Sequence, residues 1–536
     1  MRLRLRGAAA VLAGAMLIGC GGAAAPSTGA PATATSTPAT AATQAAAPVS
    51  GPDVIREAIS STGVDRIPAF TTTGEDTHIF ELIYGSLLQI QPGGSNLQPS
   101  LATSYTTSAD AKTWTFQLRK GVKWSGGYGD FTCNDVAFTW NFNKDPANKS
   151  FWKAQASAVQ SVDCPDPYTA VFHLAAPNAD FGWAVADVEP STGWIISKAA
   201  WDKLGKAGYE QTPIGTGPYM IKQVIPNQEV DLVANPDYWG PKPAVPSVQF
   251  KVITDAQTAA LAVASGALDI ASVDAVTAAQ YKSNAKVKTV VKPALQTQWI
   301  EINTKLKPFD DVRVRDAIRY AIDYPTLVKN VFLGLAQVGP EAIIMPGEIG
   351  YDASVNPNNV YDPTKAKQLL QQAGVSSVKG DIATYNSQVD VNAGQLITAD
   401  LQQAGIDLQV RNYDRGTLDA VWAKNDTAAA ILGAAASPDP SFILSVCFLS
   451  SQNPPGGLNI ARYSGIDQLF QQQQTAPTEA ARVQYVKQIQ QQIAQDAPGW
   501  NLWIQDDIWL VNPRVQNFLP TVYFSGDPLN LVTLGG

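Results

Sequence analysis

The residues that most often carry out chemistry in enzymes are scarce in this chain. It has only two histidines, His78 and His173, among 536 residues. It contains no Gly-x-Ser-x-Gly elbow, no His-Glu-x-x-His helix, no Walker-type phosphate loop and no Cys-x-x-Cys pair. Carboxylates are numerous enough to supply a glycosidase acid pair, but no spacing singles one out. We therefore expect no enzyme activity, no cofactor and no metal site.

Cys20 ends an N-terminal segment with the layout of a bacterial secretion signal. Three arginines among the first six residues precede an uncharged run over residues 7–19, shorter than the ~20 apolar residues that a bilayer span needs. The run ends in Leu17-Ile18-Gly19-Cys20, which resembles the lipobox, where the cysteine is acylated. This predicts a signal peptide over residues 1–19 and a protein held on the extracytoplasmic face of the cell membrane by lipid on Cys20.

The composition then divides the chain into a tether and a folded part. Residues 21–50 contain neither a charge nor an aromatic side chain, so residues 20–52 are predicted to be a disordered, lipidated tether. The remaining ~480 residues exceed the size at which single cores stop growing, so we expect more than one lobe. Loss of the signal segment leaves 35 basic and 46 acidic residues, a formal charge of −11. This balance argues against nucleic acid as a partner, and against membrane contact other than through the lipid.

The folded part alternates between strand and helix patterns, which favours an α/β fold. Residues 248–252 alternate as a strand, residues 255–264 have the spacing of a helix, and residues 268–270 follow as a short strand. Helices are also expected at residues 311–322, at residues 363–373 after an Asp362 cap, and at residues 396–404. An alternating strand is expected at residues 406–410.

Three further cysteines lie in the folded part. Cys133 and Cys164 each lie at the edge of a predicted β region in the same lobe, so they could pair in an oxidising compartment. The alternative is that these two and Cys447 are all buried thiols. The sequence leaves both possibilities open.

Four stretches are spread in order along nearly the whole mature chain. They are Trp114–Trp124 with Phe131–Val136, Ile214–Tyr219 with Asn235–Gly240, Asp311–Asp323, and Asp439-Pro440 after Gly433–Ala436. Together they resemble the extracellular solute-binding proteins of family 5, the oligopeptide/dipeptide/nickel-binding class of ABC transporters. Within this pattern, the glycines of residues 214–219 suit a tight turn.

The resemblance implies a fold and a division of the chain. It implies a two-lobed, periplasmic-binding-protein-like α/β fold of type II, in its large class with an extra subdomain, and a monomer. The second lobe is inserted into the first, with crossings placed near residues 294–299 and 498–503. The implied parts are lobe 1 at 53–296 with a subdomain at about 100–210, lobe 2 at 297–499, and a return to lobe 1 at 500–536.

The resemblance also implies a function and a site. Such receptors close by a hinge around a solute and present it to ABC permease subunits. In peptide-binding members an extended ligand pairs with protein backbone, a role that falls here on Gly433, Ala434, Ala435 and Ala436. The loop carrying Thr72, Thr73 and Gly74 is placed opposite. Trp299 and Trp422 are candidate walls of the pocket, or else core aromatics.

This chain departs from the pattern of peptide-binding family members at two positions that bear on the kind of ligand. Peptide binders often have tryptophan and aspartate where this chain has Ala434 and Ser437, and a neutral hydroxyl cannot replace a buried carboxylate that faces a cation. Asp439 could take that role. The leading interpretation is a receptor for a peptide or peptide-like solute. The alternatives are the same fold binding an oligosaccharide or other small solute, a secreted hydrolase, and a surface sensor.

Overall fold

The computed structural model describes most of the chain beyond Pro52. It describes residues 53–63, 66–70, 74–91, 96–187, 193–341, 343–355, 361–424, 427–435, 438–454, 457–520 and 528–535. The predicted signal segment, Cys20 and the tether lie outside these residues. Within the described ranges, no helix is both long and apolar enough to cross a bilayer.

One mixed sheet runs through both lobes. Its strand order is β15-β14-β16-β12-β17-β11-β1-β10-β9-β8, and β13 pairs with β17 off this path. In chain order these strands are β1 (Val54–Ile59), β8 (Tyr219–Ile225), β9 (Glu229–Ala234), β10 (Ser247–Val252), β11 (Ile270–Ser272), β12 (Lys288–Ile302), β13 (Ala336–Val338), β14 (Val378–Tyr385), β15 (Ile406–Tyr413), β16 (Ala429–Ala435) and β17 (Gly499–Val511).

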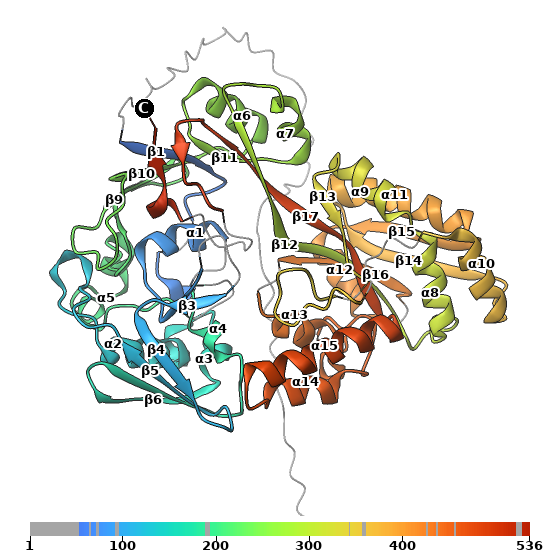
Figure 1. The fold of residues 1–536 in the computed structure, drawn as a ribbon, viewed down its shortest axis with the longest axis horizontal. Coiled ribbons are helices and arrows are strands. Elements are labelled where there is room, and N and C mark those ends of the chain that lie inside the picture. Colours follow the sequence, from blue (N-terminus) through green and yellow to red (C-terminus); the bar gives the residue numbers. More distant parts are fainter. Residues whose placement is uncertain are drawn as a thin grey trace, which may run out of the picture. The chain divides into compact units, whose positions relative to one another are not determined.

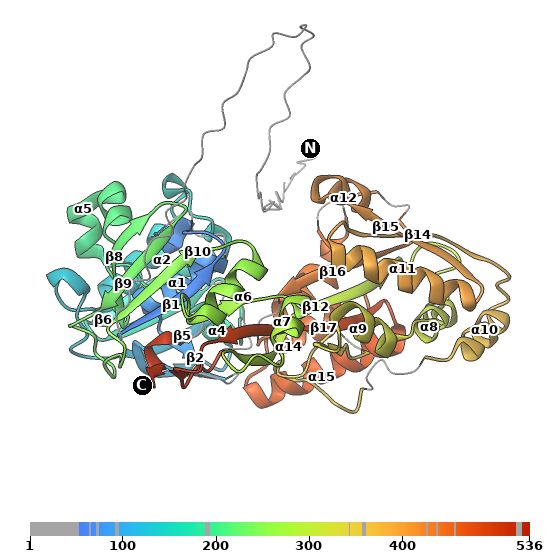
Figure 2. The same ribbon diagram turned by 90° about the horizontal axis from the view of Figure 1, so that it is seen from above.

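The long antiparallel strands β12 and β17 connect the two lobes, and Figures 1 and 2 show them running side by side between them. Trp500, Leu502 and Trp503 pack in the core of lobe 2, whereas Ile508 and Leu510 pack in lobe 1 against α6 (Ala256–Ser265) and α7 (Ala275–Tyr281). The register of β12 is interrupted between Pro293 and Gln296, opposite Asp506 and Gln505. This interruption on β12 lies near the crossing predicted at residues 294–299. The residues opposite it on β17 lie a few positions after the crossing predicted at residues 498–503.

Lobe 1 covers its end of the sheet with helices and carries the predicted subdomain. Its larger helices are α1 (Gly74–Ile83), α2 (Cys133–Lys144), α5 (Lys198–Gln211), α6 (Ala256–Ser265) and α7 (Ala275–Tyr281), with the short α3 (Lys153–Ala156) and α4 (Phe181–Ala184). The subdomain holds an antiparallel sheet in the order β4-β5-β7-β6. These strands are β4 (Ala102–Thr107), β5 (Thr113–Leu118), β6 (Val159–Asp166) and β7 (Thr169–Leu174). Lobe 1 also contains the short hairpin of β2 (Leu88–Ile90) with β3 (Leu97–Pro99), and a two-stranded sheet of β18 (Val515–Gln516) with β19 (Thr533–Leu534).

A disulfide joins Cys133, the first residue of α2, to Cys164 on β6. The sequence left open whether Cys133 and Cys164 pair or are buried thiols, and in the structure they pair. Cys447, the last residue of α13 (Ser441–Cys447), is a buried free thiol. Because the bridge ties a helix to the strand beneath it across a 31-residue separation, it restricts the unfolded chain of the subdomain.

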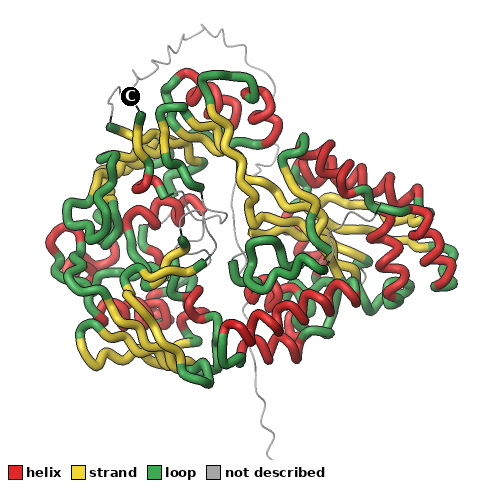
Figure 3. The backbone as a smooth tube through the Cα atoms, viewed as in Figure 1, coloured by secondary structure: helices red, strands yellow, loops and turns green. Residues whose placement is uncertain are grey.

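Lobe 2 packs helices on both faces of its part of the sheet, as the red and yellow segments of Figure 3 show. One core contains residues of β12, β14, β15 and the helices α8 to α11. The other contains Trp299, Trp422 and residues of α13 and α15. The helices are α8 (Val312–Ala321), α9 (Tyr324–Phe332), α10 (Pro363–Gln372), α11 (Gln388–Gln403), α12 (Arg415–Trp422), α13 (Ser441–Cys447), α14 (Asp467–Gln474) and α15 (Glu479–Asp496).

Local signals in the sequence determine several of these elements. The Asp255 side chain accepts from the Thr258 backbone N–H at 2.7 Å and starts α6. Gly266 ends it with φ of 79°, a left-handed conformation that glycine adopts without strain. Asp362 caps α10 in the same way, with Pro363 in its first turn. Two predicted elements differ in their bounds: β11 begins at Ile270, where the strand predicted at residues 268–270 ends, and the helix predicted at residues 396–404 is the second half of α11, which begins at Gln388.

Candidate functional site

The end of β16 is paired on one side only. On the β12 side its register runs from Ala429 to Ala435. On the β14 side pairs form at Ala429 and Ala430, and among the described residues no strand continues that ladder beyond Ala430. The N–H and C=O groups along this edge can therefore pair with an added extended chain. Gly433, Ala434 and Ala435 of the predicted site lie on this segment.

Small side chains keep this strand close to its neighbour. Gly433 lies opposite Gln298 in the register, and a Cβ on Gly433 would come 3.0 Å from Gln298 Cγ. Such a contact is tighter than ordinary van der Waals distance, so a larger residue would push on the Gln298 side chain. The segment thus combines a free backbone edge on one side with close packing at Gly433 on the other.

Two polar side chains beside this strand were not predicted. Asp390 lies in the first turn of α11 with 4% of its surface exposed, and its Oδ2 accepts a hydrogen bond from the Ser387 hydroxyl. Burial raises the pKa of Asp390, while Ser387 and the nearby Gln298 amide act to lower it. Among the described residues, neither Asp390 Oδ1 nor Gln298 Oε1 has a hydrogen-bond partner. In the sequence, Asp390 resembles any acid in the first turn of a helix.

The two candidate wall tryptophans lie in the core of lobe 2. Trp299 is 1% exposed, and its indole N–H donates to Glu301 Oε1 at 2.9 Å. Trp422 is 3% exposed and packs edge-on against Tyr385 with ring centroids 5.8 Å apart. Both rings therefore support the sheet behind β16, and their contact with a solute stays a prediction.

Asp439, the predicted alternative anchor for a ligand amine, already has a cationic partner. Its carboxylate forms a buried salt bridge with Arg482 on α15 at 2.6 Å. It also accepts from the Ser441 backbone N–H at 2.9 Å, at the start of α13. The carboxylate thus joins the loop after β16 to α13 and α15, and the salt bridge offsets its charge.

Some of the predicted site residues lie at the borders of the described ranges. Thr72, Thr73, Ala436 and Ser437 lie outside the described residues. Gly74 begins α1, so the predicted loop leads directly into that helix. The arrangement of this loop relative to β16 stays a prediction.

Contacts between lobe 1 and the α14–α15 region of lobe 2 were not predicted from sequence. The Ala179 backbone N–H donates to the Gln474 carbonyl at 3.2 Å, and Gln474 Nε2 donates to Asp180 Oδ2 at 3.3 Å. Arg482 lies 3.7 Å from the same Asp180 carboxylate. No periodicity or motif near these residues indicates that they meet across about 300 positions of sequence.

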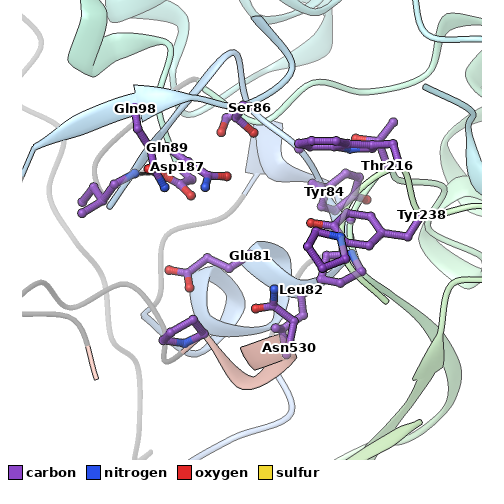
Figure 4. Close-up of a pocket in the computed structure, with 18 of the residues that line it drawn as sticks. Glu81, Leu82, Tyr84, Ser86, Gln89, Gln98, Asp187, Thr216, Tyr238 and Asn530 are labelled. Carbon is purple, nitrogen blue, oxygen red and sulfur yellow. Dashed lines mark hydrogen bonds between the residues drawn. The ribbon is translucent and has the colours of Figure 1, made fainter. Parts of the chain in front are cut away.

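A cavity of about 430 Å³ lies within lobe 1. Figure 4 shows Gln89, Gln98 and Asp187 on its left side and Tyr84, Thr216 and Tyr238 on its right, with Glu81 between them. Asp187 accepts from the Ile90 backbone N–H at 2.8 Å, and burial raises its pKa to about 7. Two of the sequence stretches singled out above, residues 214–219 and 235–240, therefore meet at one cavity.

Glycine is needed in the 214–219 segment for a reason other than the predicted tight turn. Neither Gly215 nor Gly217 has a positive φ. A Cβ on Gly215 would lie 1.9 Å from the Ile83 carbonyl oxygen, and one on Gly217 would lie 2.6 Å from the Ile83 carbonyl carbon. Close approach to the end of α1, rather than a special turn conformation, excludes any side chain at these positions.

The two histidines lie in structural surroundings. His78 lies 3.4 Å from Glu57 and packs edge-on against Phe250. His173 contacts Asp163 at 3.1 Å on the exposed face of the subdomain sheet. In the part of the chain that the structure describes, no group of three His, Cys, Asp or Glu side chains could hold a metal ion.

Comparison with known proteins gives a family. The model of the bacterial extracellular solute-binding proteins, family 5 Middle, matches residues 96–455. A putative ABC transporter peptide-binding protein of Brucella ovis is 26% identical over 450 residues, which cover 81% of this chain and 84% of the relative. The glutathione-binding protein GsiB of Escherichia coli O1:K1 / APEC is 30% identical over 450 residues, covering 81% of this chain and 86% of GsiB.

A solved structure extends the comparison to three dimensions. The ABC transporter-associated periplasmic binding protein DppA of Helicobacter pylori, in complex with the peptide STSA, is similar with a TM-score of 0.69 at 27% identity. The match covers 90% of this chain and 98% of DppA. The two-lobed α/β fold and the resemblance inferred from sequence are confirmed.

Proposed function

We propose that this chain, which belongs to the bacterial extracellular solute-binding proteins of family 5, captures a peptide or peptide-like solute between its lobes and delivers it to the permease of an ABC importer. The observation that carries the proposal is the free edge of β16 beyond Ala430. An extended peptide satisfies such an edge with its own backbone groups. The relatives named for peptides and for glutathione support the same class of solute.

The side chains next to this edge supply polar contacts in this proposal. Asp390 Oδ1 and Gln298 Oε1 are acceptors, so they favour donors such as amide or ammonium N–H groups on the solute. A buried acceptor without a partner costs about 1–3 kcal/mol, which a bound donor would recover. Asp439 is not needed for this contact, because Arg482 already neutralises it.

Calorimetry with matched peptides tests the proposal. A short peptide is expected to bind, and the same peptide with its backbone nitrogens methylated is expected to lose most of its affinity because it can no longer pair with the strand edge. Equal binding of both peptides, or no binding across a random peptide library, would contradict it. An oligosaccharide released from the protein in native mass spectrometry would favour the alternative solute.

The side-chain contacts have their own test. Asp390→Asn keeps the size of the side chain and removes its charge, so it is expected to weaken peptide binding several-fold. Asp407→Asn is the matched control, because Asp407 is an exposed residue on β15 of the same lobe. Equal effects of the two variants would remove Asp390 from the site.

We also propose that the receptor acts as a lipid-anchored monomer on the extracytoplasmic face of the membrane. The support is the signal-like segment over residues 1–19, the Leu17-Ile18-Gly19-Cys20 sequence and the uncharged tether that follows. Metabolic labelling with palmitate is expected to mark the wild-type protein and to be lost in Cys20→Ala. Light scattering of the released protein is expected to give the mass of one chain.

A further inference from the structure

We propose that the cavity in lobe 1 is a second binding site, which takes a small organic cation carrying a primary ammonium group. The lining residues come from residues 81–86 at and after the end of α1, residues 89–90 and 98–100 in and beside the β2–β3 hairpin, Arg119, Asp187, residues 216–218, residues 238–241 and residues 528–531. None of these belongs to the segment that forms lobe 2. A ligand held here would therefore need no closure of the lobes, unlike a solute held between them.

The charges around the cavity favour a cation. Glu81 and Asp187 bring two carboxyl groups to its wall. Among the described residues, Asp187 forms no ion pair. A carboxylate that is shielded from water and lacks a counter-ion attracts a positive group more strongly than an exposed one does.

Among the described residues that line the cavity, Arg119 carries the one guanidinium, and this group is held by contacts within the wall. Arg119 Nε donates to the Ser100 carbonyl at 3.1 Å. Its guanidinium carbon stacks over the Trp239 ring at 4.3 Å from the ring centroid. Since Arg119 is held by the ring and the carbonyl, it closes one side of the cavity without neutralising Asp187.

The remaining surfaces suit the body of an amine. The aromatic rings of Tyr84, Tyr238 and Trp239 and the rings of Pro99 and Pro218 line the cavity, and they can pack against methylene groups. The Thr216 hydroxyl is 1% exposed and has no hydrogen-bond partner among the described residues. It offers a further acceptor to an ammonium group, which has three N–H donors.

The wall that carries Thr216 is rigid. A Cβ on Gly85 would lie 2.4 Å from Thr216 Oγ1, and the neighbouring Gly215 and Gly217 pack directly on the end of α1. At about 430 Å³ the cavity lies within the ~300–1,000 Å³ range of small-molecule pockets. Close packing of this wall on α1 means that little of it has to be ordered when a ligand binds.

Calorimetry of the purified protein with putrescine, and with 1,4-butanediol as its uncharged analogue, tests the inference. Putrescine is expected to bind and butanediol is not. Asp187→Asn and Glu81→Gln are each expected to weaken putrescine binding at least tenfold. The control Asp202→Asn removes an exposed carboxylate of α5 that pairs with Lys198 and is expected to change nothing.

Two further measurements keep the result decisive. Asn530→Trp fills the cavity from the C-terminal segment without removing a buried charge, and it is expected to abolish putrescine binding even if a carboxyl variant folds poorly. A saturating peptide is expected to leave putrescine affinity unchanged. Failure of putrescine to bind, equal binding in all variants, or displacement by peptide would overturn the inference, whereas failure of peptide binding alone would count only against the proposed function.

Discussion

Arg482 and Asp439 form a salt bridge at 2.6 Å whose two side chains are 3% and 5% exposed. The same guanidinium donates to Ser441 Oγ at 2.8 Å and to Gln473 Oε1 at 2.7 Å through its Nε. It also lies 3.7 Å from Asp180 of lobe 1. One arginine therefore stabilises the loop after β16 and approaches the opposite lobe.

Replacing Arg482 with leucine is expected to destabilise the protein by about 3–5 kcal/mol, because Asp439 would be left as an uncompensated buried charge. Urea unfolding followed by fluorescence measures the change. Arg411→Leu is the control, since Arg411 pairs with Asp381 on the surface, where both side chains are more than half exposed, and such pairs contribute ~1 kcal/mol or less. Similar losses in the two variants would contradict the special role of Arg482.

Asp180→Ala is expected to weaken the contact between the lobes while leaving each lobe folded. It removes the acceptor of Gln474 Nε2 and the lobe-1 charge that faces Arg482. Small-angle scattering without ligand should then report a larger mean radius of gyration than for wild type. An unchanged radius, compared with the surface variant Asp202→Ala, would show that this contact does not hold the lobes together.

Gly215→Ala is expected to lower the melting temperature clearly, because its Cβ would lie 1.9 Å from the Ile83 carbonyl oxygen. Overpacking of this kind typically costs about 1–3 kcal/mol. Gly182→Ala is the matched control, since the nearest atom to its Cβ would be Leu97 Cδ1 at 3.3 Å, a side-chain atom rather than backbone. Equal melting temperatures of the two variants would mean that α1 can move away from the 214–219 segment.

Loss of the disulfide is expected to destabilise the subdomain. For a separation of 31 residues, the loop-closure model gives about 3–4 kcal/mol. The Cys133→Ala, Cys164→Ala double variant should unfold at a lower denaturant concentration than wild type. A reductant should lower the unfolding midpoint of the wild-type protein toward that of the double variant. Cys447→Ala, which removes a free thiol, should not change the response to reductant.

Stability is expected to fall as the pH rises from about 5 to 8. Burial raises the pKa of Asp187 and Asp507 to about 7 and of Glu301 and Glu348 to about 8. These acids keep their protons in the native state above the pH at which they ionise in the unfolded chain, near ~4. The unfolded state then binds fewer protons, so the free energy of unfolding decreases through this window.

Thermal unfolding at pH 5 and pH 8 measures this dependence. Asp507→Asn is expected to flatten it, because the variant removes one of the groups that titrates in the window. Its carboxyl pKa is raised by burial first and by the neighbouring Asp506 second. A melting temperature that is equal or higher at pH 8 would contradict the prediction.

The sequence by itself determined the local elements and the family. Asp255 and Gly266 mark both ends of α6, and Asp362 with Pro363 marks the start of α10, because helix caps depend on residues within one turn. The motifs at residues 214–219 and 235–240 indicated the receptor fold, since a resemblance needs only their order along the chain. The presence of only two histidines likewise argued, without any structure, against enzymes that depend on several of them.

Only the tertiary structure decided which distant residues meet. The pairing of Asp439 with Arg482 exists only because α15 lies beside the loop after β16, and Asp180 meets Gln474 although 294 positions separate them. The free edge of β16 depends on where β14 stops pairing, and the lobe-1 cavity depends on α1 meeting the C-terminal segment. Burial, pairing and cavities are set by long-range packing, to which the spacing of residues along the chain gives no direct access.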